Sequence, residues 1–156
     1  YEQGFFVTYY LCPTDYHRVH SVVDGQILKA IYQPGHLWPV NLWARENIKS
    51  LFAVNERVVL QFESRVTRCA MVFVGATNVG KIKLSFDPEI IGNLPGANKG
   101  FSKVYDPAIE VSRGQEVGLF SMGSTIVMIY PKSVSLQRED WQVFLNQSVK
   151  VGETFL

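Results

Sequence analysis

The sequence predicts a mainly β fold, either a β-sandwich or a partly closed barrel with a few short helices. Seven short runs rich in Val, Ile, Phe and Tyr follow one another along the chain, and Gly, Pro, Asn or Asp lie between most of them. Short strands at such spacing are typical of sandwiches and barrels. The chain has 156 residues and no internal repeat, low-complexity tract or linker, so we expect one domain over residues 1–156.

The expected strands are rich in β-branched and aromatic side chains, which strands favour. In chain order the seven runs are Phe5–Leu11, Gln26–Tyr32, Arg57–Phe62, Ala70–Val74, Lys81–Phe86, Glu116–Phe120 and Thr125–Tyr130. The stretch Asp87–Lys99 is rich in Pro and Gly, and we expect a loop or the tip of an extended hairpin there.

Two stretches are expected to be helical. Thr14 follows a proline and can cap a helical turn over Asp15–His20, because its hydroxyl can accept hydrogen bonds from the free amides of a helix start. The second is Asn41–Ser50. Its apolar residues that are expected to face the core are Leu42, Ile48 and Leu51.

The composition excludes some classes of function. The chain has 15 basic and 14 acidic residues, scattered along its length, so it lacks the basic stripe of a nucleic-acid-binding protein. No apolar run approaches the roughly 20 residues of a membrane-spanning helix. Cys12 and Cys69 lack the spacing of a metal motif, and we expect both to be small core residues in a reducing compartment.

One tetrapeptide, Met122-Gly123-Ser124-Thr125, stands directly before the apolar run Ile126 to Tyr130. A Gly-Ser bond can be both a substrate and the source of a cofactor. If a base removes the hydroxyl proton of Ser124, the oxygen can attack the Gly123 carbonyl and convert the amide into an ester. Elimination and hydrolysis then break the chain and leave a pyruvoyl group in place of Ser124. The alternative for this motif is an ordinary turn that enters a strand.

A second motif, Asp15-Tyr16-His17-Arg18-Val19-His20, holds two of the three histidines in the chain. Histidine is the side chain best suited to moving protons near neutral pH. On a helical turn both rings would leave the same face and reach one pocket, whereas on a strand they would point to opposite faces. Two alternatives are hydrogen bonding within the core and a metal site. The metal donors would be His17, His20 and His36 with Asp15 or Asp24, but the His-Glu-x-x-His pattern is absent.

Five separated stretches together resemble the phosphatidylserine decarboxylase family, from about Tyr10 to Tyr130. They are YYLCPTDYHRVHSVVDG, PGHLWPVN, LFAVNERVVL, FVGATNVGKI and GQEVGLFSMGSTIVMIY, and they occur in the order of the family. The chain departs from the family at Met122, where Leu is normal, and at Lys81, where a small residue is common.

The resemblance implies self-cleavage at Gly123-Ser124 and a pyruvoyl cofactor made from Ser124. By motif position His20 is the base of the cleavage, and His17, assisted by Asp15, returns the proton after decarboxylation. Residues 1–123 would form the β-subunit part and residues 124–156 the α-subunit part.

The family aspartate that orients the base precedes the histidine motif and is missing here. We therefore expect a fragment without the N-terminal segment of the family; the alternatives are that Asp15, Asp24 or another acid substitutes, or that cleavage is impaired.

The resemblance also implies a substrate and a location. The substrate would be phosphatidylserine in a membrane and the product phosphatidylethanolamine. The enzyme would sit peripherally at a bacterial cytoplasmic membrane or a mitochondrial inner membrane, and a homodimer is one assembly that the resemblance allows. Gly75, Ala76, Thr77 and Asn78 would offer backbone amides to the substrate, unless they form only a tight turn.

Further apolar and polar residues have two interpretations each. Leu37 and Trp38, with Trp43 nearby, would line the lipid path, unless they are buried core. Asn55-Glu56-Arg57 is expected to be a turn with an ion pair that supports the pocket. Two rival functions remain, a pyruvoyl-dependent decarboxylase of a soluble amino acid and an uncleaved, non-catalytic β module.

Overall fold

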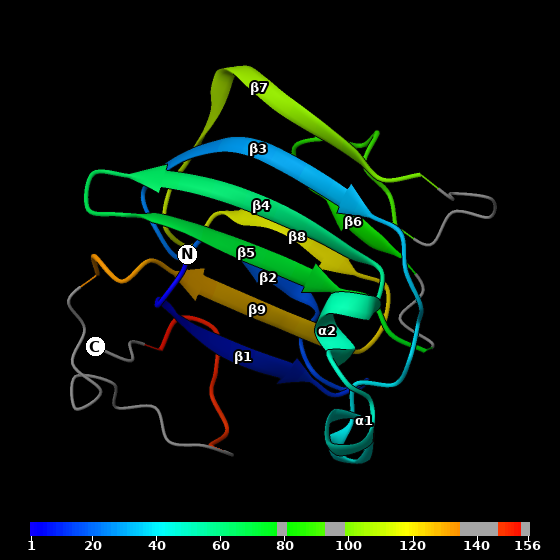
Figure 1. Cartoon of the computed structure of the whole chain (residues 1–156). Coiled ribbons are helices and arrows are strands. Elements are labelled where there is room, and N and C mark those ends of the chain that lie inside the picture. Colours follow the sequence, from blue (N-terminus) through cyan, green and yellow to red (C-terminus); the bar gives the residue numbers. More distant parts are fainter. Residues whose placement is uncertain (78–80, 93–98, 135–146, 154–156) are drawn as a thin grey trace.

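A computed structural model of the chain describes residues 1–77, 81–92, 99–134 and 147–153 (Figure 1). These residues form nine strands and two short helices. The strands are β1 (Phe5–Leu11), β2 (Arg18–His20), β3 (Gly25–Gln33), β4 (Arg57–Ser64), β5 (Arg68–Val74), β6 (Ile82–Leu84), β7 (Phe101–Val111), β8 (Glu116–Phe120) and β9 (Ser124–Tyr130). The helices are α1 (Leu42–Asn47) and α2 (Leu51–Val54).

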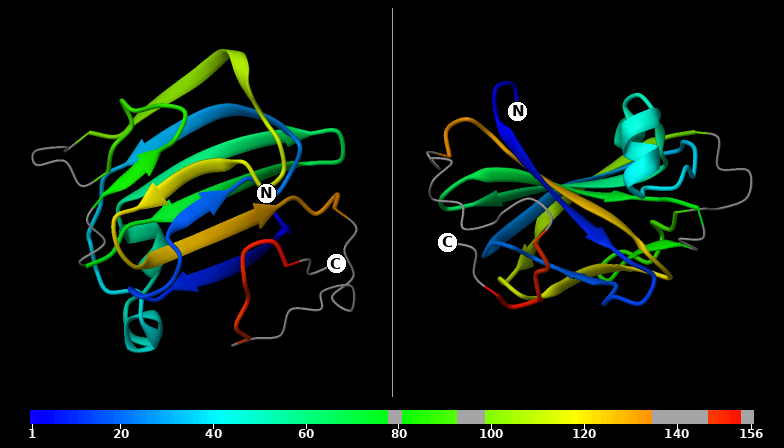
Figure 2. Two further views of the ribbon diagram at one scale, coloured as in Figure 1. Left: turned by 180° about the vertical axis from the view of Figure 1, so that it is seen from behind. Right: turned by 90° about the horizontal axis from the view of Figure 1, so that it is seen from below.

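The strands form two open sheets, which confirms the mainly β prediction. The large sheet has the order β1-β9-β5-β4-β3-β7, and the small sheet has the order β2-β8-β6. All strand pairs in both sheets are antiparallel. The small sheet lies against one face of the large one, as the two views in Figure 2 show, so the molecule is a two-layered sandwich.

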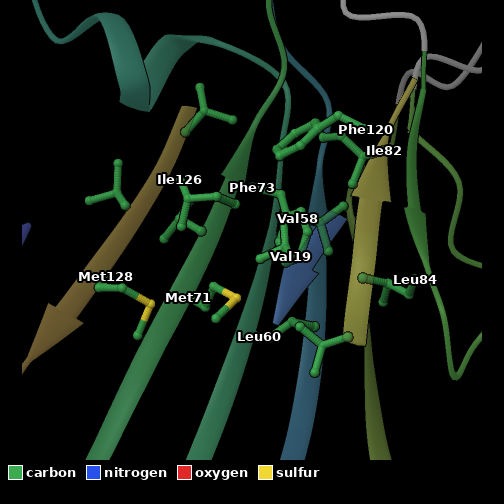
Figure 3. Packing of buried hydrophobic residues seen from close by; sticks show 14 of the residues in the cluster. Val19, Val58, Leu60, Met71, Phe73, Ile82, Leu84, Phe120, Ile126 and Met128 are labelled. Atoms are coloured by element: carbon green, nitrogen blue, oxygen red, sulfur yellow. The ribbon is translucent and has the colours of Figure 1, made fainter. Parts of the chain in front are cut away.

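The hydrophobic core fills the space between the sheets (Figure 3). In β4 the alternate residues Val58, Leu60 and Phe62 are fully buried, as the two-residue period of a strand with one core face requires. Phe73 of β5 and Phe120 of β8 join the two sheets with ring centroids 5.4 Å apart. Packing between the layers therefore fixes which faces of β5 and β8 meet.

All seven predicted strands exist, but two strands were missed. β7 was missed because its side chains are mostly exposed and Pro107 interrupts the pattern. It is the edge strand of the large sheet, and proline is tolerated on an edge because one side of the strand needs no ladder bonds. The expected loop at Asp87–Lys99 is found as far as Gly92, and residues 93–98 lie outside the described part.

The predicted helical turn over Asp15–His20 is wrong. The chain makes a tight turn at Cys12–Asp15, where the amide of Asp15 donates to the Cys12 carbonyl, and Arg18–His20 then becomes β2. β2 pairs with β8, and Val19 is buried between the layers. Long-range pairing with β8 therefore outweighs the local helix signal of Thr14.

The helix predicted over Asn41–Ser50 is shorter and is followed by a second one. Asn41 caps α1 by accepting a hydrogen bond from the amide of Ala44 at 3.0 Å. The prediction that Leu42 faces the core is wrong, because Leu42 is 65% exposed. The buried residue of α1 is Ala44. Leu51 is buried as predicted, and it opens α2.

The two cysteines differ. Cys69 is buried as expected, and burial raises the pKa of its thiol to about 11. Cys12 is exposed, so its assignment to the core was wrong, because it lies in the turn that replaces the predicted helix.

Candidate active site

The Gly123-Ser124 bond lies where the chain passes from the small sheet to the large one. The segment after β8 crosses between the layers, and Ser124 opens β9 opposite Leu11 of β1. A Cβ atom at Gly123 would lie 2.9 Å from the nitrogen of Pro13 and 3.0 Å from the Leu11 carbonyl oxygen. Only glycine fits this close backbone approach. The side chain of Ser124 lies outside the described part of the structure.

The ring of His20 is held by two hydrogen bonds. Its Nδ1 lies 2.8 Å from the carbonyl oxygen of Gly114, and its Nε2 lies 2.9 Å from the hydroxyl of Tyr16. Because a carbonyl can only accept, Nδ1 carries the proton and donates, and Nε2 accepts from Tyr16. The Tyr16 ring also stacks on the imidazole at 5.7 Å between centroids. These contacts fix the orientation of the His20 ring, and in the neutral imidazole they select the tautomer that has its proton on Nδ1 and its acceptor at Nε2.

His17 has a different environment. Its backbone carbonyl accepts a hydrogen bond from the amide of Phe120 at 3.0 Å, at the end of β8 that leads to Ser124. Its Nε2 atom is buried and has no hydrogen-bond partner among the described residues. The same is true of Oγ1 of Thr125, the residue after Ser124. Buried polar atoms without partners are rare and call for an explanation, often a functional one.

The two histidines do not share a helical face, because no helix forms there. The candidate carboxylates are also engaged elsewhere. Asp15 accepts from the amide of Cys12 at 2.7 Å, and Asp24 accepts from the amide of Arg113 at 2.8 Å. Within the described residues, the group that accepts from Nδ1 of His20 is the Gly114 carbonyl and not a carboxylate. No group of three or more His, Cys, Asp or Glu side chains gathers as a metal site within the described residues.

A hollow of about 110 Å³ lies beside Gly123, and we call it the Gly123 hollow. It is smaller than the roughly 300 to 1,000 Å³ of a typical ligand pocket, so it suits a small group or one end of a larger ligand. It is lined by Tyr10, Leu11, Pro13, Pro39, Val40, Asn41, Ala76, Thr77 and Gly123. Segments far apart in the sequence thus meet at the candidate cleavage site.

Asn55 joins two of these segments. Its side chain is fully buried, accepts from the amide of Trp38 at 3.2 Å, and donates to the carbonyls of Trp38 and Gly75, both at 2.9 Å. The hydroxyl of Thr77 adds a hydrogen bond to the carbonyl of Leu37. The walls of the Gly123 hollow are therefore held together by side-chain to backbone hydrogen bonds.

The residues next to Asn55 complete this support. Glu56 is buried and accepts a hydrogen bond from the hydroxyl of Tyr32 at 2.8 Å. Burial, and then this hydrogen bond, raise the pKa of the Tyr32 phenol, so Tyr32 remains a donor. The guanidinium of Arg57 donates to the carbonyls of Ala53 and Asn55.

The predicted substrate loop is only partly available. The amide of Gly75 donates to the carbonyl of Glu56 at 2.8 Å, so it is not free to bind a ligand. Ala76 and Thr77 do line the Gly123 hollow, and Asn78 lies outside the described residues.

Large apolar side chains are exposed around the Gly123 hollow. Each is a lining residue or lies within a few positions of one along the chain, and we call them the apolar rim: Tyr10, Trp38, Leu42, Trp43 and Met122. Their exposed fractions run from 45% at Met122 to 65% at Leu42 and Trp43. Leu37, by contrast, is half-buried. Among the described residues, no helix has the length and apolarity to cross a membrane.

Several residues of the site were not predicted. Tyr16 lies inside the histidine motif, and its spacing of four residues from His20 was the one available signal. Gly114 acts through its backbone carbonyl, for which the sequence carries no pattern. Asn55 was expected in a turn that supports the pocket, but its hydrogen bonds to the backbone of Trp38 and Gly75 were not predicted.

Comparison with known proteins gives a consistent result. A family model described as phosphatidylserine decarboxylase matches residues 1–156. A phosphatidylserine decarboxylase proenzyme of Anaeromyxobacter sp. (strain K) is 41% identical over 151 residues, which are 96% of this chain and 52% of that protein. One of Dechloromonas aromatica is 38% identical over 154 residues, which are 98% of this chain and 53% of that protein.

A relative described as mitochondrial has a similar identity. Phosphatidylserine decarboxylase proenzyme 1, mitochondrial, of Oryza sativa subsp. japonica is 41% identical over 140 residues, 83% of this chain and 32% of that protein. The chain spans about half the length of the bacterial relatives that it matches.

Proposed function

Because this chain belongs to the phosphatidylserine decarboxylase family, we propose that it is the part of a proenzyme that cuts itself between Gly123 and Ser124 and then decarboxylates phosphatidylserine to phosphatidylethanolamine. The observation that carries this proposal is the position of the Gly123-Ser124 bond. Tight backbone contact with Leu11 and Pro13 holds it beside a hollow. Thr125, directly after this bond, and His17, whose carbonyl accepts from the Phe120 amide, each have a buried polar atom with no partner among the described residues.

In the proposed cleavage, a base takes the hydroxyl proton of Ser124, and the oxygen forms a bond to the Gly123 carbonyl carbon. The C–N bond breaks, the nitrogen takes up a proton, and an ester replaces the amide. The base then removes the α-proton of Ser124, and the C–O bond breaks to release the Gly123 carboxylate. Water hydrolyses the remaining enamine, releases ammonia, and leaves the ketone of a pyruvoyl group.

We assign the base of this cleavage to His20. Its Nδ1 proton is directed to Gly114, so Nε2 is the nitrogen that can accept a proton. The Gly114 carbonyl would then take the orienting role that a carboxylate has in other serine nucleophiles. Tyr16 must give up its hydrogen bond to Nε2 when the base acts.

The described residues fit a pyruvoyl group at position 124. The tight backbone contacts of Gly123 support this position, and the buried Nε2 of His17 offers an atom that has no partner in the described structure. The group would supply a carbonyl that condenses with an amine and withdraws electrons during loss of carbon dioxide. His17, with Asp15 assisting, would return the proton to the product carbon.

Cleavage would leave two chains in one folded unit. After the cut β9 is still paired with β1 on one side and β5 on the other, and β8 is still paired with β2 and β6. Residues 1–123 and 124–156 would therefore stay together as the two subunits. Association of two such units into a homodimer is also proposed.

A lipid substrate is favoured over a soluble amino acid by the apolar rim. The Gly123 hollow has Ala76 and Thr77 in its wall, and the exposed apolar side chains of the rim are lining residues or follow or precede lining residues closely in the chain. A headgroup entering the hollow would leave its acyl chains beside Trp38 and Leu37. We therefore propose a peripheral location at a bacterial cytoplasmic or mitochondrial inner membrane.

Intact mass under denaturing conditions tests the cleavage. The purified protein should give two pieces, residues 1–123 and residues 124–156, and the second piece should have a blocked N-terminus. Ser124→Ala should remain one chain. If the wild-type protein also remains a single chain with a free serine, the proposal of a self-cleaving enzyme is wrong and the non-catalytic β module is supported.

Release of carbon dioxide tests the substrate class. The cleaved protein should act on vesicles that contain phosphatidylserine and not on free serine. The reverse preference would support the decarboxylase of a soluble amino acid.

A further inference from the structure

Thr125 is an exception among the buried polar residues of this protein. Within the described residues these are Ser21, Asn55, Glu56, Asp87 and Thr125. Ser21 donates to the carbonyl of Val23, Asn55 bonds to Trp38 and Gly75, Glu56 accepts from Tyr32, and Asp87 accepts from Tyr105. Thr125 is 1% exposed, and its Oγ1 has no partner in the described structure.

Packing does not explain a hydroxyl at this position. Thr125 lies inside the large sheet, paired with Tyr10 of β1 and Val74 of β5, and the three residues that follow it are apolar. Valine has the same shape and a higher affinity for an apolar site, and burying an unpaired hydroxyl costs free energy. A threonine here is therefore unfavourable for stability alone.

The location of Thr125 is next to the bond that the proposed reaction rearranges. Ser124 precedes it directly, and Gly123 lies two residues away at the wall of the Gly123 hollow. Tyr10, which is paired with Thr125, lines the same hollow. This hydroxyl, which has no partner among the described side chains, is thus held near the cleavage site by strand pairing on both sides.

We infer that the hydroxyl of Thr125 is a hydrogen-bond donor for the self-cleavage, directed to the Gly123 carbonyl oxygen as this oxygen gains negative charge. The inference rests on the proposed function. A donor that is held close to the reacting bond and shielded from water can stabilise such an oxygen strongly, and loss of one such donor typically slows a reaction by about 10² to 10³. Burial of the hydroxyl thus lowers the stability of the uncut chain, and the hydroxyl makes its favourable hydrogen bond only in the transition state of the cleavage.

Two substitutions test this inference. Thr125→Val keeps the shape and removes the donor, and Thr125→Ser keeps the donor. The rate of chain cutting is followed on a denaturing gel, and Thr8→Val, the same change on the neighbouring strand β1, is the matched control. We expect Thr125→Val to cut at least tenfold more slowly, while Thr125→Ser and Thr8→Val cut within about threefold of wild type.

Thermal unfolding separates this role from a structural one. It is measured in the uncut Ser124→Ala background, so that cleavage does not alter the comparison. We expect Thr125→Val to unfold at the same or a higher temperature, because it removes an unpaired buried hydroxyl.

Two outcomes would overturn the inference. The first is cutting by Thr125→Val at the wild-type rate, and the second is slow cutting together with a lower unfolding temperature, which would mean that the hydroxyl has a structural partner. Failure of the proposed function itself is distinguishable, since the wild-type chain would then remain uncut.

Discussion

His17 and His20 belong to one short motif but have opposite surroundings. Both nitrogens of His20 are engaged, one by the Gly114 carbonyl and one by the Tyr16 hydroxyl. Nε2 of His17 is buried without a partner in the described structure. An imidazole in a fixed tautomer suits a base, and an unpaired buried nitrogen suits a group that meets a substrate.

These surroundings predict different effects of replacing each histidine. His20→Ala should stay uncut, because no other base reaches Ser124 in the proposed mechanism. His17→Ala should cut itself but lose decarboxylation by roughly 10² to 10⁴, the usual contribution of a positioned acid or base. Denaturing gels measure the first effect and release of carbon dioxide from phosphatidylserine measures the second.

The third histidine provides the control. His36 is exposed, lies beside Trp38 and belongs to neither β2 nor β8, so His36→Ala should cut and decarboxylate as the wild type does. An uncut His17→Ala together with a cut His20→Ala would exchange the two roles. This exchange of roles is the main alternative to our assignment. Phe120, whose amide donates to the His17 carbonyl, lies only four residues before Ser124.

At the scale of elements, the sequence predicts strands well where apolar residues are buried in a regular pattern. β4 has alternating buried residues and β9 has a continuous buried apolar run, and both were predicted within two residues of their ends. β2 could not be found in this way. It has three residues, its histidine spacing also fits a helix, and only its pairing with β8, about a hundred positions away, decides the outcome.

The same limit applies to the site. Gly123, Ser124, His17 and His20 can be proposed from the sequence because their expected chemistry depends on residue type and spacing. The Gly114 carbonyl that orients His20 could not be found, since every residue has a carbonyl and only the fold selects one.

Asp87 joins the segment after β6 to the edge strand β7, and thus one sheet to the other. Its buried carboxylate accepts from the hydroxyl of Tyr105 and pairs with Nζ of Lys103, both at 2.8 Å. Burial alone would raise the pKa of Asp87, but hydrogen bonds from Lys103, Tyr105 and the backbone of Glu89 outweigh it and lower the pKa below 3.8.

This lowered pKa predicts a stability that depends on pH. The contribution of ionised Asp87 is fully present above the unfolded pKa and is lost as the pH falls through the lower folded pKa. In Asp87→Asn this contribution should be absent, so the variant should unfold more easily than wild type at pH 7 by about 1 to 3 kcal/mol and the difference should shrink below about pH 4. Denaturant unfolding of wild type and Asp87→Asn from pH 7 to pH 3 measures the difference in their free energies of unfolding and its change with pH.

An exposed acid is the control for this measurement. Glu63 forms a surface ion pair with Arg68, and Glu63→Gln should change the free energy of unfolding by less than about 1 kcal/mol. A constant difference between Asp87→Asn and wild type across this pH range would mean that the charge of Asp87 does not stabilise the fold.

At the scale of the whole molecule, the candidate cleavage site lies on the connection between the two layers. β8 belongs to the small sheet and β9 to the large one, and only three residues separate them. Cutting there removes a covalent link between the layers but no strand pairing. The fold can therefore tolerate the cut, and the new chain end stays beside the Gly123 hollow.

The apolar rim lies at the same end of the molecule as this connection. α1 and α2 are found there, whereas the turn between β4 and β5 is at the opposite end of the large sheet (Figure 1). Leu42 and Trp43 are each 65% exposed, so replacing them should cost the fold little. If this end meets a bilayer, both side chains leave water on binding.

We therefore expect the double variant Leu42→Ser, Trp43→Ser to bind vesicles that contain phosphatidylserine at least tenfold more weakly than wild type. Full burial of one such side chain contributes about 1.5 to 3 kcal/mol and a tenfold change in affinity corresponds to about 1.4 kcal/mol, so partial burial of two suffices. Co-sedimentation with vesicles measures the binding. Val66→Ser is the matched control, because Val66 is 92% exposed in the turn between β4 and β5. Equal weakening by this control would show that exposed apolar area in general, and not the rim, drives the binding, and unchanged binding of the double variant would place the membrane contact elsewhere.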